Sequence, residues 1–430
     1  MTTRNGKNSG KDVEIGEGKN HHAEMGNEKN DGKNNEKTPE EKATASFTLG
    51  PQHPAILEPE KLVLQIDGET VISARLNLGY MHRGVEELMQ RRNYKQNIVI
   101  AEHVCGICSG IHTLSYCSMA ENLLGVEIPE RAKYIRTIIA ELERIHSHML
   151  WAGVAAYEIG FDMLFHSVWR DRELVMDVLE SITGNRVNHG MNTIGGVRRD
   201  VPKSRHDEIL KALGKLEKRA GYYAKVFTKD SMIKKRTVNV GILRKTDAVK
   251  LMATGPLARA SGVRRDVRKE SPYAAYGLVD WDVHVEKGCD VASRAVVRIS
   301  ELKECAKIIS SCLKHMPEGE LKVKVPPIVP EAEAVFRGEA PRGEIFYYGI
   351  SRGGLNPYRV KIKTPTYSNA LSLSTMLAGA KLADVPIIVA SIDPCFCCTD
   401  RVTVIDYSTG KTKTVGKNEL VNRSGSNGIF

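Results

Sequence analysis

Apolar and polar positions alternate where the patterned part of the chain begins. The stretches KLVLQID (61–67) and TVISARLNL (70–78) place apolar residues at every second position, and a Gly-Glu pair separates them. A period of two is typical of β-strands with one buried face. The two stretches are therefore predicted to form an antiparallel strand pair joined by a tight turn.

Farther along, apolar residues recur three and four positions apart, which is the spacing of a helix. This pattern runs from GVEELMQ to about residue 230 and is most continuous over residues 131–165. We find no internal repeat. The order of elements predicts an α+β fold with a long-helix core and small β-sheets in its N-terminal and C-terminal parts. Further helices are predicted at 207–227, 284–315 and 369–385, and strands at 321–329, 343–351 and 386–392.

Residues 1–43 form a low-complexity segment rich in Asn, Gly, Lys and Glu. The segment has no aromatic residue and few large aliphatic ones, so it cannot bury enough apolar surface to offset the entropy of ordering. We predict a disordered tail over residues 1–43, one domain over residues 44–401, and a C-terminal extension over residues 402–430.

Composition narrows the class of protein. The 430 residues contain no apolar run near the ~20 residues of a membrane-spanning helix and no apolar signal segment, which predicts a cytoplasmic location. Nine cysteines, an odd number, favour free thiols or metal ligands over a disulfide framework. The net charge of +10 is spread among acidic residues without an aromatic-studded basic stripe, so we expect no nucleic-acid partner.

Two C-x-x-C pairs stand at opposite ends of the patterned region. HVCGIC contains Cys105 and Cys108, and DPCFCC contains Cys395 and Cys398. Zinc sites usually draw their ligands from within a few tens of residues, whereas these pairs are separated by most of the chain. Spacing alone leaves open a redox metal, structural zinc and unliganded core thiols. Cys397, next to Cys398, is expected to point away from its neighbours as a bystander.

The residues around both pairs resemble the two metal-binding signatures of the nickel-iron hydrogenase large subunit. HVCGICSGIH places a histidine four residues after the first pair, and IDPCFCCTDR has Asp-Pro before the second. HRGVEELMQ, APRGEIFYYG and KTPTYSN resemble intervening elements of that family. GPQHPAILEP and ADVPIIVASIDPC resemble its membrane-bound, energy-converting branch, which is related to the 49-kilodalton subunit of complex I. The resemblance spans residues 46–405 and implies the same large-subunit fold.

This resemblance implies a nickel-iron centre whose iron carries carbon monoxide and cyanide. Cys105 and Cys395 match the terminal nickel ligands, and Cys108 and Cys398 match the ligands that bridge the two metals. Soft thiolates suit such metals. The resemblance makes Cys395 the group that accepts a proton when hydrogen is split. The remaining cysteines are expected to be small buried apolar residues: Cys117, Cys289, Cys305 and Cys312.

Four further residues match the surroundings of that centre. Arg342 matches an arginine that leans over the open coordination position, with a surface arginine in a turn as the alternative. Pro365 and Thr366 match the element around an iron-bound cyanide. His112 matches a histidine that hydrogen-bonds a bridging sulfur, with an ordinary core histidine as the alternative.

Two carboxylates match groups that handle protons or magnesium. Glu58 matches the glutamate that relays protons from the terminal cysteine, with an exposed glutamate beside Pro59 as the alternative. Glu86 matches a residue that supports Mg²⁺ or the proton network. Arg401 stands where chains of this family are cut after metal insertion, so residues 402–430 are expected to be a maturation peptide removed by an endopeptidase.

The resemblance implies the catalytic subunit of an energy-converting hydrogenase, attached peripherally to the cytoplasmic membrane through a complex. Its expected partners are a small subunit with a [4Fe-4S] cluster, ferredoxin and antiporter-like membrane subunits. The first alternative is a non-catalytic coupling subunit like the complex I relative, which lacks the four cysteines. The others are a soluble coenzyme-reducing hydrogenase and a zinc-stabilised structural protein.

Overall fold

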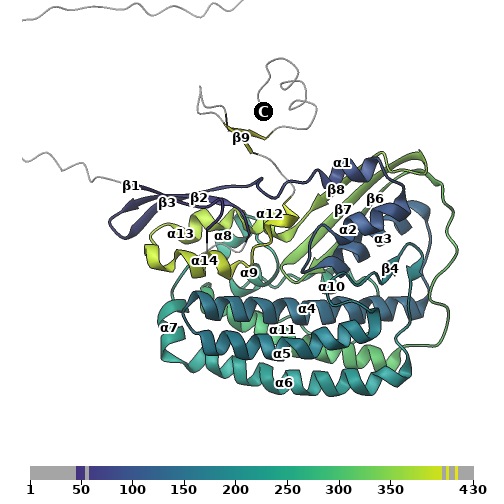
Figure 1. Ribbon diagram of the computed structural model, residues 1–430, viewed down its shortest axis with the longest axis horizontal. Helices are drawn as coiled ribbons and strands as arrows, with labels where there is room; N and C mark the ends of the chain where they lie inside the picture. The colour runs from purple at the N-terminus through teal and green to yellow at the C-terminus, as the bar shows by residue number, and fades with distance from the viewer. Residues whose placement is uncertain (1–44, 54–57, 400–402, 406–411, 415–430) are drawn as a thin grey trace, which may run out of the picture. The chain divides into compact units, whose positions relative to one another are not determined.

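The computed structural model describes residues 45–53, 58–399, 403–405 and 412–414. The fold mixes helices and small antiparallel sheets, which confirms the predicted α+β class. A layer of long helices, packed side by side, forms the predicted core (Figure 1). The four helices are α4 (Glu130–Glu158), α5 (Asp162–Thr183), α6 (His206–Lys229) and α11 (Val291–His315).

The continuous helical pattern over residues 131–165 divides into two helices. Helix α4 ends at Glu158 with Ile159 as its C-cap, Gly160 takes a left-handed backbone conformation with φ of 79°, and α5 begins at Asp162. A short connection of this kind folds the second helix back against the first. Buried side chains of both helices, including Ile138, Leu142 and Val175, belong to the largest apolar cluster. Burying each such side chain contributes about 1.5–3 kcal/mol.

The predicted N-terminal strand pair is confirmed and gains a third strand. Strands β1 (Ala45–Leu49), β2 (Lys61–Asp67) and β3 (Thr70–Asn77) form an antiparallel sheet in that order. Gly50 has φ of 91°, and a Cβ there would lie 1.8 Å from the carbonyl oxygen of Glu60. The connection between β1 and β2 therefore requires glycine at this point.

A second antiparallel sheet consists of β6 (Val329–Ala340), β7 (Gly343–Gly354) and β8 (Arg359–Lys363). The strand predicted at 343–351 is confirmed, and helix α3 (Ser109–Leu124) packs against β6 and β7. The strand predicted at 321–329 is wrong except at its last residue. The consecutive prolines Pro326 and Pro327 cannot donate to a ladder, and only an isolated bridge from Lys322 to Gly196 forms there.

The strand predicted at 386–392 is wrong, because this apolar run forms helix α14 (Val385–Ser391). Pro386 stands in its first turn, where a fixed φ favours a helix. The helix is buried almost all round, so it shows no amphipathic period, and a short apolar run cannot by itself distinguish a buried helix from a buried strand. The boundaries of two other predicted helices also differ from the structure. The helix predicted at residues 369–385 is interrupted at Ala378, and the helix predicted at 284–315 begins at Val291, after the N-cap Asp290.

The remaining helices and strands are short. None of the helices in the described ranges combines the length and apolar character needed to cross a bilayer. The predicted tail over residues 1–43 and the cut position at Arg401 lie outside the described residues, as does most of the predicted extension. The other elements are α1 (Val85–Gln90), α2 (Tyr94–Glu102), β4 (Asn192–Thr193), β5 (Gly196–Val197), α7 (Ser231–Thr237), α8 (Lys245–Lys250), α9 (Gly255–Ala260), α10 (Val267–Glu270), α12 (Pro365–Asn369), α13 (Ser372–Leu377), β9 (Thr403–Ile405) and β10 (Thr412–Thr414).

Candidate metal centre

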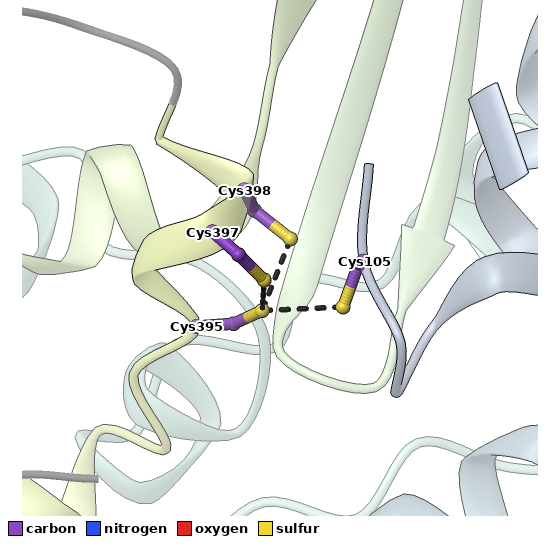
Figure 2. Close-up of side chains that lie close together, drawn as sticks. All are labelled: Cys105, Cys395, Cys397 and Cys398. Atoms are coloured by element: carbon purple, nitrogen blue, oxygen red, sulfur yellow. Dashed lines mark hydrogen bonds between the residues drawn. The ribbon is translucent and has the colours of Figure 1, made fainter. Parts of the chain in front are cut away.

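The two distant cysteine segments meet in the folded chain. Cys105 lies in the loop between α2 and α3, and Cys395 precedes a 3₁₀ turn, Phe396–Cys398, that follows α14. The Sγ atoms of Cys105 and Cys395 are 3.2 Å apart, and those of Cys395 and Cys398 are 3.1 Å apart (Figure 2). Cys397 joins them, with its Sγ 3.1 Å from that of Cys395. The expectation that Cys397 points away from its neighbours is therefore wrong.

The cluster divides into two overlapping groups of potential metal ligands. Cys105, Cys395, Cys397 and Cys398 form the first, and within it the four sulfur atoms lie within 4.8 Å of one another. Cys108, His112 and Cys398 form the second. Cys398 belongs to both groups. A sulfur shared between two adjoining ligand groups suits a pair of soft metal ions, so the donor set fits a bimetallic centre.

Protons are unevenly shared among these thiols. Hydrogen bonds from Cys108, Cys395 and other neighbouring thiols lower the pKa of Cys105 well below its ordinary value. The hydrogen bond between Cys105 and Cys108 has the opposite effect on Cys108 and raises its pKa to about 12. Closely packed thiols cannot all ionise without a compensating charge. A soft divalent cation would displace these protons and allow the sulfur atoms to act together as ligands.

Arg342 supplies a fixed positive charge beside the sulfur atoms. Its Nε donates to the carbonyl oxygen of Asp393 at 2.8 Å, and its Nη2 donates to the Asp393 carboxylate at the same distance. Burial opposes the charge, but Asp393, Cys395 and Cys108 outweigh that effect and hold the Arg342 pKa above its ordinary value. The guanidinium is only 3% exposed, which excludes the alternative of a surface arginine.

Two threonines hold the backbone of the second cysteine segment. The Oγ1 of Thr366 accepts a hydrogen bond from the Cys395 amide at 3.1 Å, and Pro365 stands beside it at the start of α12. The hydroxyl of Thr364 donates to the carbonyl oxygen of Cys398 at 3.0 Å. Thr364 was not predicted as a site residue, although it belongs to the same Thr-Pro-Thr element.

His112 lies between a sulfur atom and a tyrosine. Its Nε2 is 3.6 Å from the Sγ of Cys398, and its Nδ1 is 2.7 Å from the hydroxyl of Tyr347. Burial lowers the His112 pKa to about 4, so the ring is neutral at physiological pH. Tyr347 was not predicted as a site residue, because the alternating pattern of β7 shows only that this residue is buried.

Glu58 lies against the second cysteine segment. Its carboxylate accepts a hydrogen bond from the Cys397 amide at 2.9 Å, and one of its oxygens lies 3.9 Å from the Sγ of Cys395. Burial raises the pKa of Glu58. These contacts exclude the alternative of a solvent-facing glutamate beside Pro59.

Glu60, which was not predicted as a site residue, is more deeply buried than Glu58. Its side chain is 1% exposed, and neither carboxylate oxygen has a hydrogen-bond partner. Burial, with a contribution from Glu58, raises the Glu60 pKa to about 9. The side chain is therefore a neutral carboxylic acid at physiological pH.

Glu86 lies in neither ligand group of the described residues. Its carboxylate accepts hydrogen bonds from the Ile362 amide and the Lys361 ammonium, both at 3.0 Å, and so joins α1 to β8.

Arg83, three residues before Glu86 in the segment HRGVEELMQ, was not predicted as a site residue. It donates to the carbonyl oxygens of Val104 at 2.7 Å and Cys397 at 2.8 Å, which ties the two cysteine segments together.

The four cysteines outside the cluster differ from one another. Cys117, Cys305 and Cys312 are buried in helices, as predicted. Cys289 is only partly buried and has φ of 64° in the loop before α11, so its predicted place in a helix is wrong. In the part of the chain that the structure describes, all of these thiols stand outside the two ligand groups.

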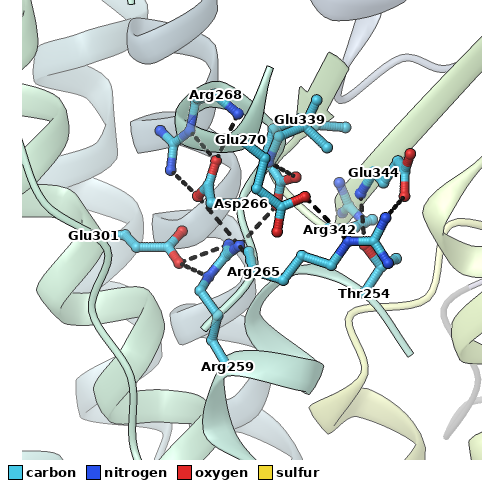
Figure 3. A network of polar contacts seen from close by, with 12 residues as sticks. Thr254, Arg259, Arg265, Asp266, Arg268, Glu270, Glu301, Glu339, Arg342 and Glu344 are labelled. Carbon is cyan, nitrogen blue, oxygen red and sulfur yellow. Dashed lines mark hydrogen bonds and ion pairs between the residues drawn. The ribbon is translucent and has the colours of Figure 1, made fainter. Parts of the chain in front are cut away.

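A buried ion network supports the loop that carries Arg342. Figure 3 shows Arg259 between Glu301 and Glu339, with which it forms ion pairs of 2.8 Å each. Arg144 donates to the carbonyl oxygens of Glu339 and Ala340, directly before the turn from β6 to β7. We define the buried ion network as Glu141, Arg144, Arg259, Asp266, Arg268, Glu301 and Glu339.

Two family models match the chain. The family described as respiratory-chain NADH dehydrogenase, 49 Kd subunit, matches residues 158–331 and 323–401. The family described as nickel-dependent hydrogenase matches residues 83–152, which include the first cysteine pair. Together with the fold and the cysteine cluster, these matches define a protein of the hydrogenase large-subunit and 49-kilodalton class.

Individual relatives indicate to which branch of this class the chain belongs. The chain is 40% identical to the carbon monoxide-induced hydrogenase of Rhodospirillum rubrum, over 84% of this chain and all of the relative. It is also 40% identical to the membrane-bound hydrogenase subunit alpha of Pyrococcus furiosus, over 87% of this chain and 91% of the relative. The chain belongs to the nickel-iron hydrogenase large-subunit family, in the membrane-bound, energy-converting branch that is related to the 49-kilodalton subunit.

A solved structure shares this fold. A chain of the membrane-bound sulfane sulfur reductase, an archaeal respiratory membrane complex, superposes with a TM-score of 0.80 at 33% identity. The match covers 85% of this chain and 100% of the other. Relatives that are named for different activities thus share one architecture, so the activity of this chain must be argued from its own side chains.

Proposed function

We propose that the chain is the catalytic large subunit of an energy-converting nickel-iron hydrogenase, which interconverts dihydrogen with two protons and two electrons. The observation that carries the proposal is the convergence of Cys105, Cys108, Cys395 and Cys398, from opposite ends of the domain, into one buried cluster. These four thiolates would hold the centre. A bound nickel-iron centre, with carbon monoxide and cyanide on its iron, would supply the electrophilic redox metals that polarise dihydrogen.

The surrounding side chains would prepare the cluster for this chemistry. Arg342, locked by Asp393, keeps a positive charge close to the thiolates and would orient dihydrogen. The neutral His112 holds the Cys398 sulfur from one side, and Tyr347 fixes the orientation of its ring. The cluster sulfurs Cys105 and Cys395 are at most 1% exposed, which keeps bulk water from the reacting atoms.

Proton transfer would begin at Cys395. Its thiolate would accept one proton from dihydrogen, and the Glu58 carboxylate, 3.9 Å away, would receive that proton next. The contact of Glu58 with the Cys397 amide fixes the carboxylate in place for this step. Glu86 is bound to β8 by its present contacts, and a role in Mg²⁺ binding or in the proton network stays a prediction.

The two electrons would leave through other subunits. The proposed partners are a small subunit with a [4Fe-4S] cluster, ferredoxin as electron carrier, and antiporter-like membrane subunits that couple the reaction to ion movement. The relatives named as membrane-bound hydrogenase and as a membrane complex support such an assembly. The chain would be attached peripherally to the cytoplasmic face of the membrane, and an endopeptidase would remove the extension after Arg401.

The alternative function is a non-catalytic coupling subunit, which the match to the 49 Kd subunit model favours. The cysteine cluster argues against it, since a coupling role requires no buried thiols. A soluble coenzyme-reducing hydrogenase and a zinc-stabilised protein remain further alternatives. The metal content of the purified complex separates these classes: nickel with iron indicates a hydrogenase, no metal indicates a coupling subunit, and zinc alone indicates a structural site.

Hydrogen–deuterium exchange tests the catalytic proposal directly. The wild-type complex should exchange D₂ with water protons, and Cys395→Ser should lower exchange to background because it removes both a metal ligand and the proton acceptor. The matched control is Cys289→Ser, which removes a partly buried thiol in the loop before α11. Exchange that persists in Cys395→Ser would remove this residue from the mechanism.

A further inference from the structure

Glu143 is a buried carboxylate that has no part in the proposed proton path. It stands near the middle of α4, and its exposed fraction is 0%. Its two oxygen atoms accept hydrogen bonds from successive backbone amides, Oε1 from Gly110 at 2.5 Å and Oε2 from Ile111 at 2.9 Å. Both amides belong to the first turn of α3, so Glu143 ties the start of that helix to α4.

The same helix start carries Cys108, which occupies the N-cap position of α3. An N-cap side chain ordinarily accepts a hydrogen bond from the amide of the second or third helical residue. The Cys108 side chain makes no such bond, and its thiol is hydrogen-bonded instead to the thiols of Cys105, Cys395 and Cys398. Glu143, from another helix, therefore supplies the cap and leaves the Cys108 sulfur to the cluster.

The first turn of α3 fits closely against Glu143. A Cβ added to Gly110 would lie 3.0 Å from the Oε1 of Glu143, so glycine lets the carboxylate reach both amides. The carbonyl oxygen of Gly110 accepts a hydrogen bond from the Nδ2 of Asn192 at 3.0 Å. Because Gly110 is held at its amide and at its carbonyl, the positions of Cys108 just before it and of His112 just after it are fixed as well.

The next turn of α4 supports the same centre. The Nε2 of His146 donates to the carbonyl oxygen of Ile107, inside the first cysteine pair, at 2.9 Å. The hydroxyl of Ser147 accepts a hydrogen bond from the Nη1 of Arg342 at 3.2 Å. Glu143, His146 and Ser147 are three and four positions apart, which places them on one face of the helix. This face of α4 thus contacts the cysteine loop, the start of α3 and the arginine beside the cluster.

We infer that Glu143 is a positioning residue for the metal centre, which caps α3 in place of Cys108 and so directs the Cys108 sulfur into the cluster. The inference rests on the proposed function for the identity of the metals. The anchoring of α3 by Glu143 can be measured without them.

Amide hydrogen exchange of the metal-free, full-length chain, followed by mass spectrometry, tests the anchoring. Peptides that contain Gly110 and Ile111 should exchange about 10–100-fold faster in Glu143→Ala, because their hydrogen bonds to a carboxylate are lost. Glu143→Gln should lie between Glu143→Ala and the wild type, since its one carbonyl oxygen can serve one amide. Exchange of these peptides at the wild-type rate in Glu143→Ala would overturn the inference.

The matched control is Asp230→Ala, which removes a cap of the same kind from α7. The Oδ1 of Asp230 accepts hydrogen bonds from the amides of Met232 at 2.9 Å and Ile233 at 3.0 Å. This variant should lose stability, as any uncapped helix does, but should leave the exchange of the peptides with Gly110 and Ile111 unchanged.

Infrared spectra of the assembled complex test the effect on the centre itself. Glu143→Gln should shift the carbon monoxide and cyanide bands, because a displaced Cys108 changes the electron density at the metals. Asp230→Ala should leave the bands in place. Bands at their wild-type positions in Glu143→Gln would show that Glu143 supports only the fold, and would overturn the inference. A wild-type complex without such bands would contradict the proposed function instead, and amide exchange would still decide whether Glu143 anchors α3.

Discussion

The cysteine cluster and the buried ion network are both rich in ionisable groups, yet they balance charge in opposite ways. In the network, Arg259 is fully buried and pairs with Glu301, Glu339 and Asp266, so carboxylates and guanidinium groups compensate one another. In the cluster, thiols adjoin thiols, and most of them must keep their protons. The network is complete within the chain, whereas the cluster becomes an ionised donor set only with added cations.

This difference separates a structural use of buried charge from a chemical one. Removing one member of a compensated network leaves an unpaired charge and destabilises the fold. Removing one thiol from the cluster leaves a smaller buried apolar residue and should change ligand binding instead. The two regions meet at the turn from β6 to β7, where Arg144 binds the backbone before Arg342. The network thus helps to position Arg342 beside the cluster.

Among side chains other than the cysteines, Glu58 in the proposed proton path is expected to have the largest effect on activity. Glu58→Gln keeps the shape of the side chain but removes the carboxylate that faces Cys395. We expect D₂–water exchange by the complex to fall about 10²–10⁴-fold, the usual contribution of a positioned acid or base. The free energy of unfolding should change little. Exchange within twofold of the wild type would contradict the proposed role of Glu58.

Breaking the buried ion network should lower the stability of the chain, whereas Glu58→Gln should lower its activity. Arg259→Met leaves the carboxylates of Glu301 and Glu339 without their shared partner, and should lower the free energy of unfolding by about 3–5 kcal/mol. Denaturant unfolding of the purified chain measures the change. The control is Arg244→Met, which alters an exposed residue before α8. Equal stability of both variants would show that the network is not a structural element.

Glu60 should make stability depend on pH. Its folded pKa of about 9 lies above the ordinary value of 4.5, so the folded state prefers the protonated acid. Its stabilising contribution is present below pH 4.5 and is lost as the pH rises through 9. Glu60→Gln should therefore flatten the decline in stability between these pH values and be more stable than wild type by about 1–3 kcal/mol at pH 8. Parallel pH curves for the two proteins would contradict this account.

The smallest effect is expected from the backbone support of the cluster. Thr364→Val removes the hydroxyl that donates to the carbonyl oxygen of Cys398. A lost hydrogen bond of this kind costs about 0.5–1.5 kcal/mol. A lower thermal midpoint of the metal-free chain would show the loss, and Thr375→Val, an exposed substitution in α13, serves as the control. Identical midpoints would mean that water replaces the hydroxyl.

Much of the fold was predictable because its long helices and alternating strands carry strong periodic patterns. The residues of β2, β3, α6 and β7 all show such a pattern. Helix α14 was missed because burial on all sides removes the pattern, and the segment at 321–329 was misassigned because its apolar residues include two prolines. Periodicity reports exposure, so elements without an exposed face are ambiguous.

The candidate site was predictable only where its residues lie in short spaced motifs. The cysteine pairs, Arg342 and His112 stand in such motifs, whereas Tyr347 and Glu60 look like any buried strand residue or any charged loop residue in the sequence. Cys397 was noticed but assigned the wrong direction. The spacing of residues in a sequence does not determine the path of a short turn, and here the contacts of that turn with Glu58 and Arg83 direct the thiol inward.

Infrared spectroscopy of the purified complex tests most directly whether these thiols hold a nickel-iron centre. The proposal predicts sharp absorption bands from carbon monoxide and cyanide bound to iron, because protein groups do not absorb in that region. The bands should disappear in Cys398→Ser, which removes the sulfur common to both ligand groups. An intact wild-type complex without carbonyl and cyanide bands would contradict the bimetallic centre and the hydrogenase activity that depends on it.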